Sequence, residues 1–281
     1  MIGCGPNQRG GALLLLVLAL IGALGPALER SRAASAADSF FMGSQAYVAG
    51  DYPLAATFYR QAAADAPAPG VWHNLGNAEW HCGHPGKAIL AWERAQWLDP
   101  FNANTRANLR YARKTAHLDG PNLAWYEVYS AWLPASAWAV ITTASFWIAV
   151  ALVTVPGWMR WRKADWPQGF AAVGFTLFLL TTPALIGVST RSRLGVVLID
   201  QAPLRLTPTH DAQSLAKLAA GESARWERER GNYVYIRVNN ESAGWVQRAQ
   251  FSPICEFRPR FQNGSSSPGM DTGGTGNRST R

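Results

Sequence analysis

The sequence predicts a multidomain membrane protein that combines an all-α helical repeat array, two transmembrane helices and a small all-β barrel. Three observations support this fold class. Apolar residues gather in three blocks, over residues 12–24, 135–155 and 169–190, rather than spreading through the chain as in one soluble globule. Residues 38–118 repeat their own pattern. Residues 194–254 contain short runs rich in β-branched and aromatic residues.

Composition narrows the class of protein further. The 281 residues are 48% hydrophobic and 16% charged, which is apolar for a soluble protein of this length. The net charge of +8 is spread along the chain, so no segment carries the concentrated positive face typical of nucleic-acid binding. The cysteines, Cys4, Cys82 and Cys255, form no CxxC pair, which argues against a disulfide-stapled mini-domain and a structural zinc site.

The first apolar block predicts a secretory signal peptide over residues 1–36. Arg9 precedes the block, and the small-x-small pattern Ala34-Ser35-Ala36 follows it as a signal-peptidase site. The alternative is an uncleaved anchor, but residues 12–24 would span only about 20 Å of helix, less than the roughly 30 Å of a hydrocarbon core. We therefore expect export and cleavage after Ala36.

The other two apolar blocks predict transmembrane helices over residues 135–155 and 169–190. Neither block shows the polar stripe that a hairpin buried in a soluble core would need. Aromatic residues flank both blocks, as at a membrane interface: Trp125, Tyr126, Tyr129, Trp132, Trp158, Trp161 and Trp166. The connecting loop, residues 157–167, is basic, so the positive-inside rule predicts that it is cytoplasmic and that both flanking regions lie outside.

Residues 37–118 predict stacked helix pairs. The segment matches itself after a shift of 33 residues, and the matched pairs are Gly43 with Gly76, Ala55 with Ala88, Ala62 with Ala95 and Pro67 with Pro100. Glycine and alanine at these positions allow two helices to approach closely, and Tyr59 and Trp92 would fill the space between them. A further helix over residues 104–117 would cap the array.

The repeated pattern resembles tetratricopeptide repeats. The resemblance is clearest in Trp72-His73-Asn74-Leu75-Gly76-Asn77-Ala78 and Lys87-Ala88-Ile89-Leu90-Ala91-Trp92-Glu93-Arg94-Ala95, although the period is one residue short. It implies a concave face that holds an extended segment of a partner protein. We expect Asn74 and Asn77 to grip the partner's backbone, and Arg106 and Arg110 to bind its acidic groups. Alternatively, Asn74 bonds within the stack and the arginines form a solvated face.

Residues 194–256 predict a small all-β barrel. The expected strands cover residues 196–199, 215–218, 233–238 and 244–246. This series of runs resembles bacterial SH3 domains over nearly its whole length. Trp245 is the candidate ligand contact of this SH3-like domain; the alternative is that it closes the hydrophobic core of the barrel. The tail, residues 258–281, is predicted to be disordered because it has too little apolar surface to fold.

No sequence motif indicates an enzyme. The chain contains no GxSxG, HExxH, phosphate-loop or GxGxxG pattern, so we expect no catalytic residue and no cofactor. His81-Cys82-Gly83-His84, with His73 nearby, is the single cluster that could hold zinc or copper. Because it has no carboxylate support and lies in an expected polar turn, we predict no metal site there.

The order of the parts resembles the BatE family of the Bacteroides aerotolerance (Bat) cluster. The resemblance implies a non-catalytic component of the bacterial cytoplasmic membrane, with the repeats and the SH3-like domain on the periplasmic side. It also implies partners among Bat proteins with von Willebrand A domains and a MoxR-type ATPase system. We therefore expect an envelope scaffold that binds proteins through its repeats. The alternative is an envelope sensor or anchor whose SH3-like domain binds cell-wall peptide or glycan.

Overall fold

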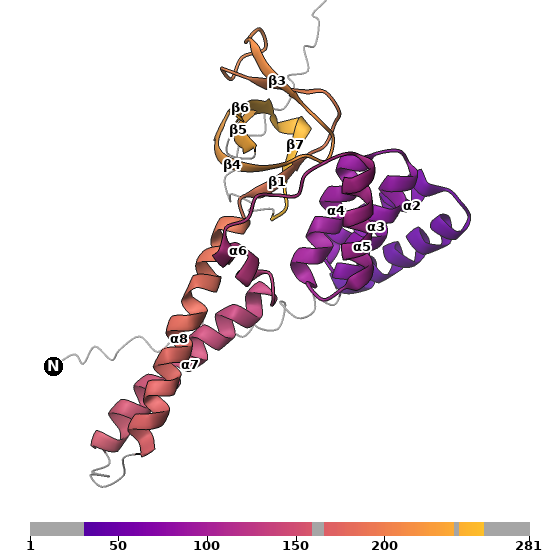
Figure 1. Cartoon of the computed structure of the whole chain (residues 1–281). Coiled ribbons are helices and arrows are strands. Elements are labelled where there is room, and N and C mark those ends of the chain that lie inside the picture. The colour runs from indigo at the N-terminus through magenta and orange to yellow at the C-terminus, as the bar shows by residue number, and fades with distance from the viewer. Residues whose placement is uncertain (1–30, 159–165, 239–241, 256–281) are drawn as a thin grey trace, which may run out of the picture.

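The computed structural model describes residues 31–158, 166–238 and 242–255 of the chain. Most of the expected signal peptide, residues 159–165 of the predicted loop and the tail of residues 258–281 lie outside these ranges. A helix covers residues 31–48, so the predicted cleavage site at Ala36 lies within helical structure. Figure 1 shows three parts in sequence: a group of short helices, a long helical hairpin, and a β-sheet at the end of that hairpin.

Helices of similar length form the first part. After the helix over residues 31–48 come α2 (Tyr52–Asp65), α3 (Pro69–His81), α4 (Pro85–Leu98) and α5 (Ala103–Thr115). The predicted capping helix begins one residue earlier than expected, because the Asn102 side chain accepts a hydrogen bond from the Thr105 amide and caps it, and it ends two residues earlier, at Thr115.

The helix pairs make equivalent contacts 33 residues apart, as the sequence predicts. A Cβ atom added to Gly43 would lie 2.9 Å from the Tyr59 ring, and one added to Gly76 would lie 2.5 Å from the Trp92 ring. Tyr59 and Trp92 are 2% and 3% exposed. Each glycine therefore leaves the space that the aromatic ring of the paired helix fills, and a larger side chain would force the two helices apart.

The turns between paired helices also repeat at this interval. Gly50 and Gly83 have φ angles of +81° and +75°, in the left-handed region that favours glycine. In the first turn, the Asp51 carboxylate also accepts a hydrogen bond from the Leu54 amide and caps α2. The chain reversal in each pair is thus set by local backbone chemistry.

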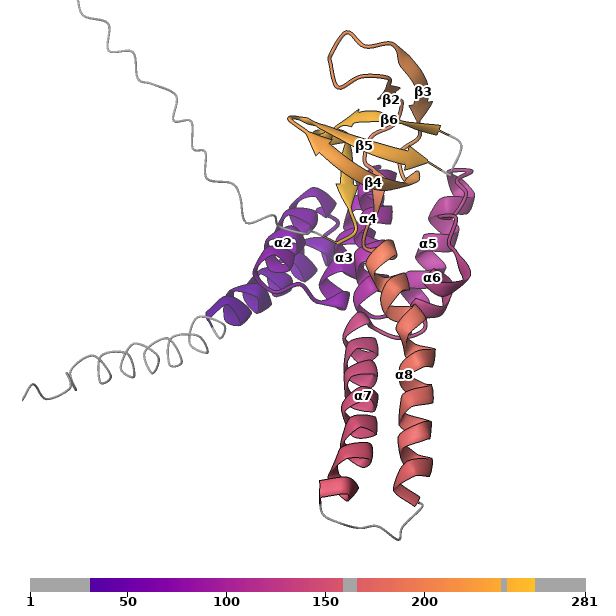
Figure 2. The same ribbon diagram turned by 90° about the vertical axis from the view of Figure 1, so that its left-hand side faces the viewer.

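The short helix α6 (Trp125–Ser130) leads into α7 (Ala135–Trp158) and α8 (Trp166–Arg191). Figure 2 shows α7 and α8 side by side as a long hairpin, with α6 and the sheet at one end. Two segments within them, Ala135–Val155 and Gln168–Arg191, are long and apolar enough to cross a membrane. The sequence did not predict α6, because its aromatic residues were read as part of an interfacial belt.

Seven strands form one antiparallel sheet in the order β3-β2-β6-β5-β4-β1-β7. Their bounds are β1 (Leu194–Val197), β2 (Ala202–Arg205), β3 (Ser214–Leu218), β4 (Ser223–Arg230), β5 (Tyr233–Val238), β6 (Ser242–Gln247) and β7 (Phe251–Pro253). Four strands were expected from apolar runs. The eight-residue strand β4 was missed because half of it is exposed and charged.

The hydrophobic core of the sheet lies on one side of its central strands. It contains Val234, Ile236 and Val238 from β5, together with Val246 from β6 and Leu204 from β2. Because side chains alternate along a strand, the residues between these point to the opposite face. This alternation decides which residues of the sheet can meet a ligand.

Candidate partner-binding surfaces

The exposed side of α5 is positively charged. Thr105, Leu109 and Ala112 of this helix are buried. Arg106 and Arg110, both predicted as partner-binding residues, are exposed one turn apart, and Lys114 continues the series at the same spacing. No acidic residue occurs in α5. We call Arg106, Arg110 and Lys114 the α5 basic stripe; it presents three cations to solvent from a helix fixed by its buried side.

The two predicted asparagines have different surroundings. The Asn77 side-chain oxygen accepts hydrogen bonds from the Trp92 indole, at 3.1 Å, and from the Asn108 amide, at 2.9 Å. Asn77 therefore ties α3 to α4 and α5, and its oxygen is already used within the helical array. Asn74 is half-buried and makes no side-chain hydrogen bond within the described ranges. The side-chain oxygen of Asn74, unlike that of Asn77, is therefore not used within the array.

The histidines of the cluster that could have held a metal contact other groups. His84 lies 2.9 Å from the buried carboxylate of Glu79, which also forms an ion pair with Arg60. His81 stacks on the Tyr52 ring at a centroid distance of 4.3 Å. His73 pairs with Thr105 at 2.8 Å, and burial lowers its pKa. Within the residues that the structure describes, no three metal-ligating side chains gather.

Cys82 and Cys255 are both free thiols in the structure. Burial raises the pKa of the Cys255 thiol to about 11, although Arg191 and Arg94 oppose this shift. Burial also raises the pKa of the Cys82 thiol. Because the thiolate is the reactive form, both cysteines are poor nucleophiles near neutral pH.

Trp245 lies on the face of the sheet opposite the core. Register pairs it with Tyr235 on β5 and Arg205 on β2, while the neighbouring Val246 pairs with the core residue Val234. Trp245 therefore lies apart from the core cluster that contains Val234 and Val246. The side chain is nevertheless only 8% exposed, because other residues of the outward face cover it.

A buried ion pair joins the sheet to the helical hairpin. Arg225 of β4 donates to both carboxylate oxygens of Glu127 of α6, at 2.7 and 2.6 Å. Glu127 is 1% exposed, and its carboxylate also accepts from the Ala124 amide at 2.9 Å. Burial alone would raise the pKa of Glu127, but the hydrogen bonds from Arg225 and Ala124 outweigh burial and lower it. The carboxylate is thus held in its charged form.

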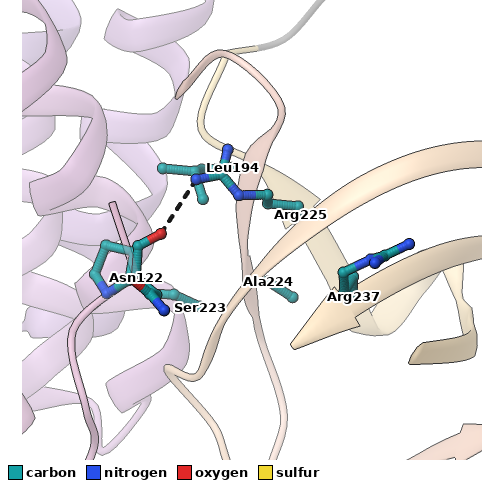
Figure 3. A pocket seen from close by; sticks show the side chains of 7 residues that line it. Asn122, Leu194, Ser223, Ala224, Arg225 and Arg237 are labelled. Carbon is teal, nitrogen blue, oxygen red and sulfur yellow. Dashed lines mark hydrogen bonds between the residues drawn. The ribbon is translucent and has the colours of Figure 1, made fainter. Parts of the chain in front are cut away.

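A shallow pocket lies beside this ion pair, between the linker that precedes α6 and the start of β4. Figure 3 shows Arg225 reaching across it to the carbonyl oxygen of Asn122, at 3.2 Å. Arg225 also donates to the Thr190 carbonyl near the end of α8, at 3.3 Å. One guanidinium therefore connects the sheet, the linker, α6 and α8. The pocket is a junction between parts of the chain.

One side of α4 packs against the sheet. A Cβ atom at Gly86 would lie 2.6 Å from the carbonyl oxygens of Val197 and Leu198. Two turns further along, Arg94 donates to the Ser252 hydroxyl at 3.2 Å and to the Pro253 carbonyl at 3.0 Å. The helical array and the sheet thus share a packed interface. The sequence gives no signal for it, because the contacts use a glycine and backbone carbonyls.

Comparison with the known protein families and with curated proteins finds no match to this chain. The class of protein is therefore defined by its parts: a helical array and a β-sheet packed together at one end of an apolar helical hairpin.

Proposed function

We propose that the protein is a non-catalytic, membrane-anchored scaffold that binds partner proteins through its helical array. The observation that carries the proposal is the repeated geometry of the helix pairs, in which Gly43 with Tyr59 and Gly76 with Trp92 make the same contact 33 residues apart. Such repetition supports a tetratricopeptide-type array, a fold that presents a surface for peptides. We likewise infer that the sheet is a bacterial SH3-like domain.

The α5 basic stripe is the surface proposed to bind the partner. Arg106, Arg110 and Lys114 lie in a row on the solvent side of α5, and arginine forms strong, forked hydrogen bonds with carboxylates. Asn74 on α3 supplies a free amide for the backbone of the bound segment. An extended acidic segment of another envelope protein fits this combination. Anchoring both proteins in one membrane would raise their effective concentration.

Reversing the charge of the stripe tests this proposal. We expect the Arg106→Glu, Arg110→Glu double variant to lose the partners that cross-linking in intact membranes recovers with the wild-type chain. Recovery by the wild type should fall as salt rises, because exposed ion pairs are screened. Lys217→Glu with Arg248→Glu is a matched control, since both residues are exposed and lie outside the helical array. Equal recovery by the stripe variant, together with loss of the partners on deletion of residues 194–254, would reject the scaffold proposal in favour of the SH3-like domain as the anchor.

We also propose that α7 and α8 cross the bacterial cytoplasmic membrane with the helical array and the sheet on the periplasmic side. Large apolar side chains along both helices are exposed, such as Trp147, Val173 and Leu180, at 62%, 66% and 60%. Lipid contact would cover this surface. The basic residues 157–167 support a cytoplasmic position for the connecting loop.

The orientation predicts the outcome of cysteine labelling in intact cells. In a background without the native cysteines, a single cysteine at Ser214 should react with a membrane-impermeant maleimide. A single cysteine at Ala164, in the connecting loop, should react only after the membrane is permeabilised. The reverse pattern would show that the orientation is inverted.

The resemblance to BatE is the basis for a narrower proposal about partners. The helical array, the hairpin and the sheet follow one another in the order typical of that family. On this basis we propose that the partners are Bat proteins with von Willebrand A domains, acting with a MoxR-type ATPase system. The same cross-linking experiment identifies them by mass spectrometry.

A further inference from the structure

We propose that the outward face of β4 and β5 is a second binding site, which takes carboxylates of an extended acidic protein segment. The face is formed by Arg228, Arg230, Tyr233 and Tyr235, and we call it the arginine–tyrosine face. It lies on the sheet, apart from the α5 basic stripe. The inference therefore goes beyond the proposed function of the helical array and does not depend on it.

Strand register places these four residues on one side of the sheet. Arg228 pairs with Tyr235, and Arg230 pairs with Tyr233. Directly opposed residues in antiparallel strands point to the same face. Val234, between the two tyrosines, belongs to the hydrophobic core on the other side. The arginine–tyrosine face is thus the side of β4 and β5 that the core does not use.

Aromatic rings hold the Arg228 guanidinium in place. Its central carbon lies 4.6 Å from the ring centroid of Tyr235 and 5.6 Å from that of Trp245. The two rings meet edge to face, with centroids 5.2 Å apart. A guanidinium stacked on aromatic rings keeps its N–H groups free around its rim, and it loses little side-chain entropy on binding an anion. Arg228 is therefore preorganised to receive a carboxylate.

The acidic residues nearest to this face are already paired. Glu227 binds Arg237 at 2.8 Å, and Glu229 lies 3.4 Å from Arg248. Arg228 and Arg230 are exposed, and within the described ranges neither forms an ion pair. The arginine–tyrosine face thus presents two unneutralised cations, and charge complementarity calls for an acidic ligand.

The geometry favours a protein segment over a sugar chain or a lipid headgroup. A sugar stacks on an aromatic ring whose face is open. Arg228 lies over the rings of Tyr235 and Trp245, and Trp245 is only 8% exposed. Arg225, which reaches the end of α8, lies five residues before Arg230 on β4. This separation is about 16 Å along the strand, so Arg230 lies well away from the helical hairpin. Lipid headgroups would lie near the hairpin, and the distance therefore argues against them as the ligand.

Binding of a fluorescein-labelled hexaglutamate peptide tests the proposal. The full chain is used in neutral detergent and carries Arg106→Glu and Arg110→Glu, so that the α5 basic stripe cannot bind the probe. We expect Arg228→Gln with Arg230→Gln to weaken binding at least about tenfold, as measured by fluorescence anisotropy. Lys217→Gln removes one exposed charge on β3, outside the face, and should leave the affinity within about twofold. Unchanged circular dichroism confirms that each variant is folded.

Three results would overturn the proposal. The first is equal affinity of the Arg228→Gln, Arg230→Gln variant and its parent. The second is an equal loss with Lys217→Gln, which would indicate a diffuse charge effect. The third is binding to vesicles that contain phosphatidylglycerol, lost in the double variant, without binding of the peptide; that result would assign the face to lipid. These three results do not depend on whether the helical array binds partners, so failure of the proposed function would not alter them.

Discussion

Replacing Trp92 with alanine is expected to lower the free energy of unfolding of the helical array by about 3–5 kcal/mol, the usual cost of removing a large buried aromatic side chain. Trp92 is 3% exposed and fills the space left by Gly76. Its indole also donates to Asn77, so the substitution leaves a cavity and removes a hydrogen bond between α3 and α4. A loss of this size is a large part of the stability of a small domain.

Thermal melting of the full chain in neutral detergent, followed by circular dichroism at 222 nm, measures this effect. Trp92→Phe should cost less, because a phenyl ring keeps most of the packing and loses only the indole hydrogen bond. Tyr111→Ala is the matched control, since Tyr111 is a 62% exposed aromatic residue of the same array. If Trp92→Ala has the same melting temperature as Tyr111→Ala, the contact between Gly76 and Trp92 does not stabilise the array.

Glu127→Gln is expected to lower the free energy of unfolding by about 3 kcal/mol, because it leaves Arg225 without its buried charge partner. The glutamine has nearly the same size, so lost packing contributes little. Adding Arg225→Met should recover part of the loss, since no uncompensated charge then remains. Melting in detergent measures the three variants, and protease cleavage within residues 116–124 reports whether the sheet has separated from α6.

The same pair predicts a dependence on pH. Because the pKa of Glu127 is lower in the folded state than in an unfolded chain, its contribution is fully present above the ordinary carboxyl range. The contribution is lost as pH falls through the lowered value. The gap in melting temperature between the wild type and Glu127→Gln should therefore close under acidic conditions, at about pH 4 and below. A gap that stays constant down to pH 3 would show that the charge of Glu127 is not what stabilises the junction.

The parts of the fold that the sequence predicts are those with local or periodic causes. The 33-residue shift identifies the paired helices, because glycine, alanine and aromatic positions must recur wherever the same helix contact recurs. The apolar runs identify α7 and α8 within a few residues, because an uncharged apolar segment of about 20 residues is typical of a long apolar helix. In the sheet, β5 is predicted to the residue by its β-branched and aromatic side chains.

The parts that the sequence does not predict depend on residues far apart in the chain. Strand β4 reads as a charged loop, because its arginines find their partners 98 residues away on α6 and across the sheet on β5. Asn77 looks like a free amide until α5 brings Asn108 to it. Trp245 is predicted to be either a core residue or an exposed ligand contact. In the structure it is a buried residue outside the main core cluster, covered by Arg228.

The packing of α4 against the sheet gives the molecule a route for mechanical force. Force applied to α5 would reach α4 through the core that the two helices share. From α4 it would reach β7 through the hydrogen bonds of Arg94. From the sheet it passes through Arg225 and Glu127 to α6 and the hairpin. Tension is therefore shared between these contacts and the linker of residues 116–124. Because these contacts connect the array to the sheet and the sheet to α6, the array should turn less freely relative to the hairpin than a domain connected by the linker alone.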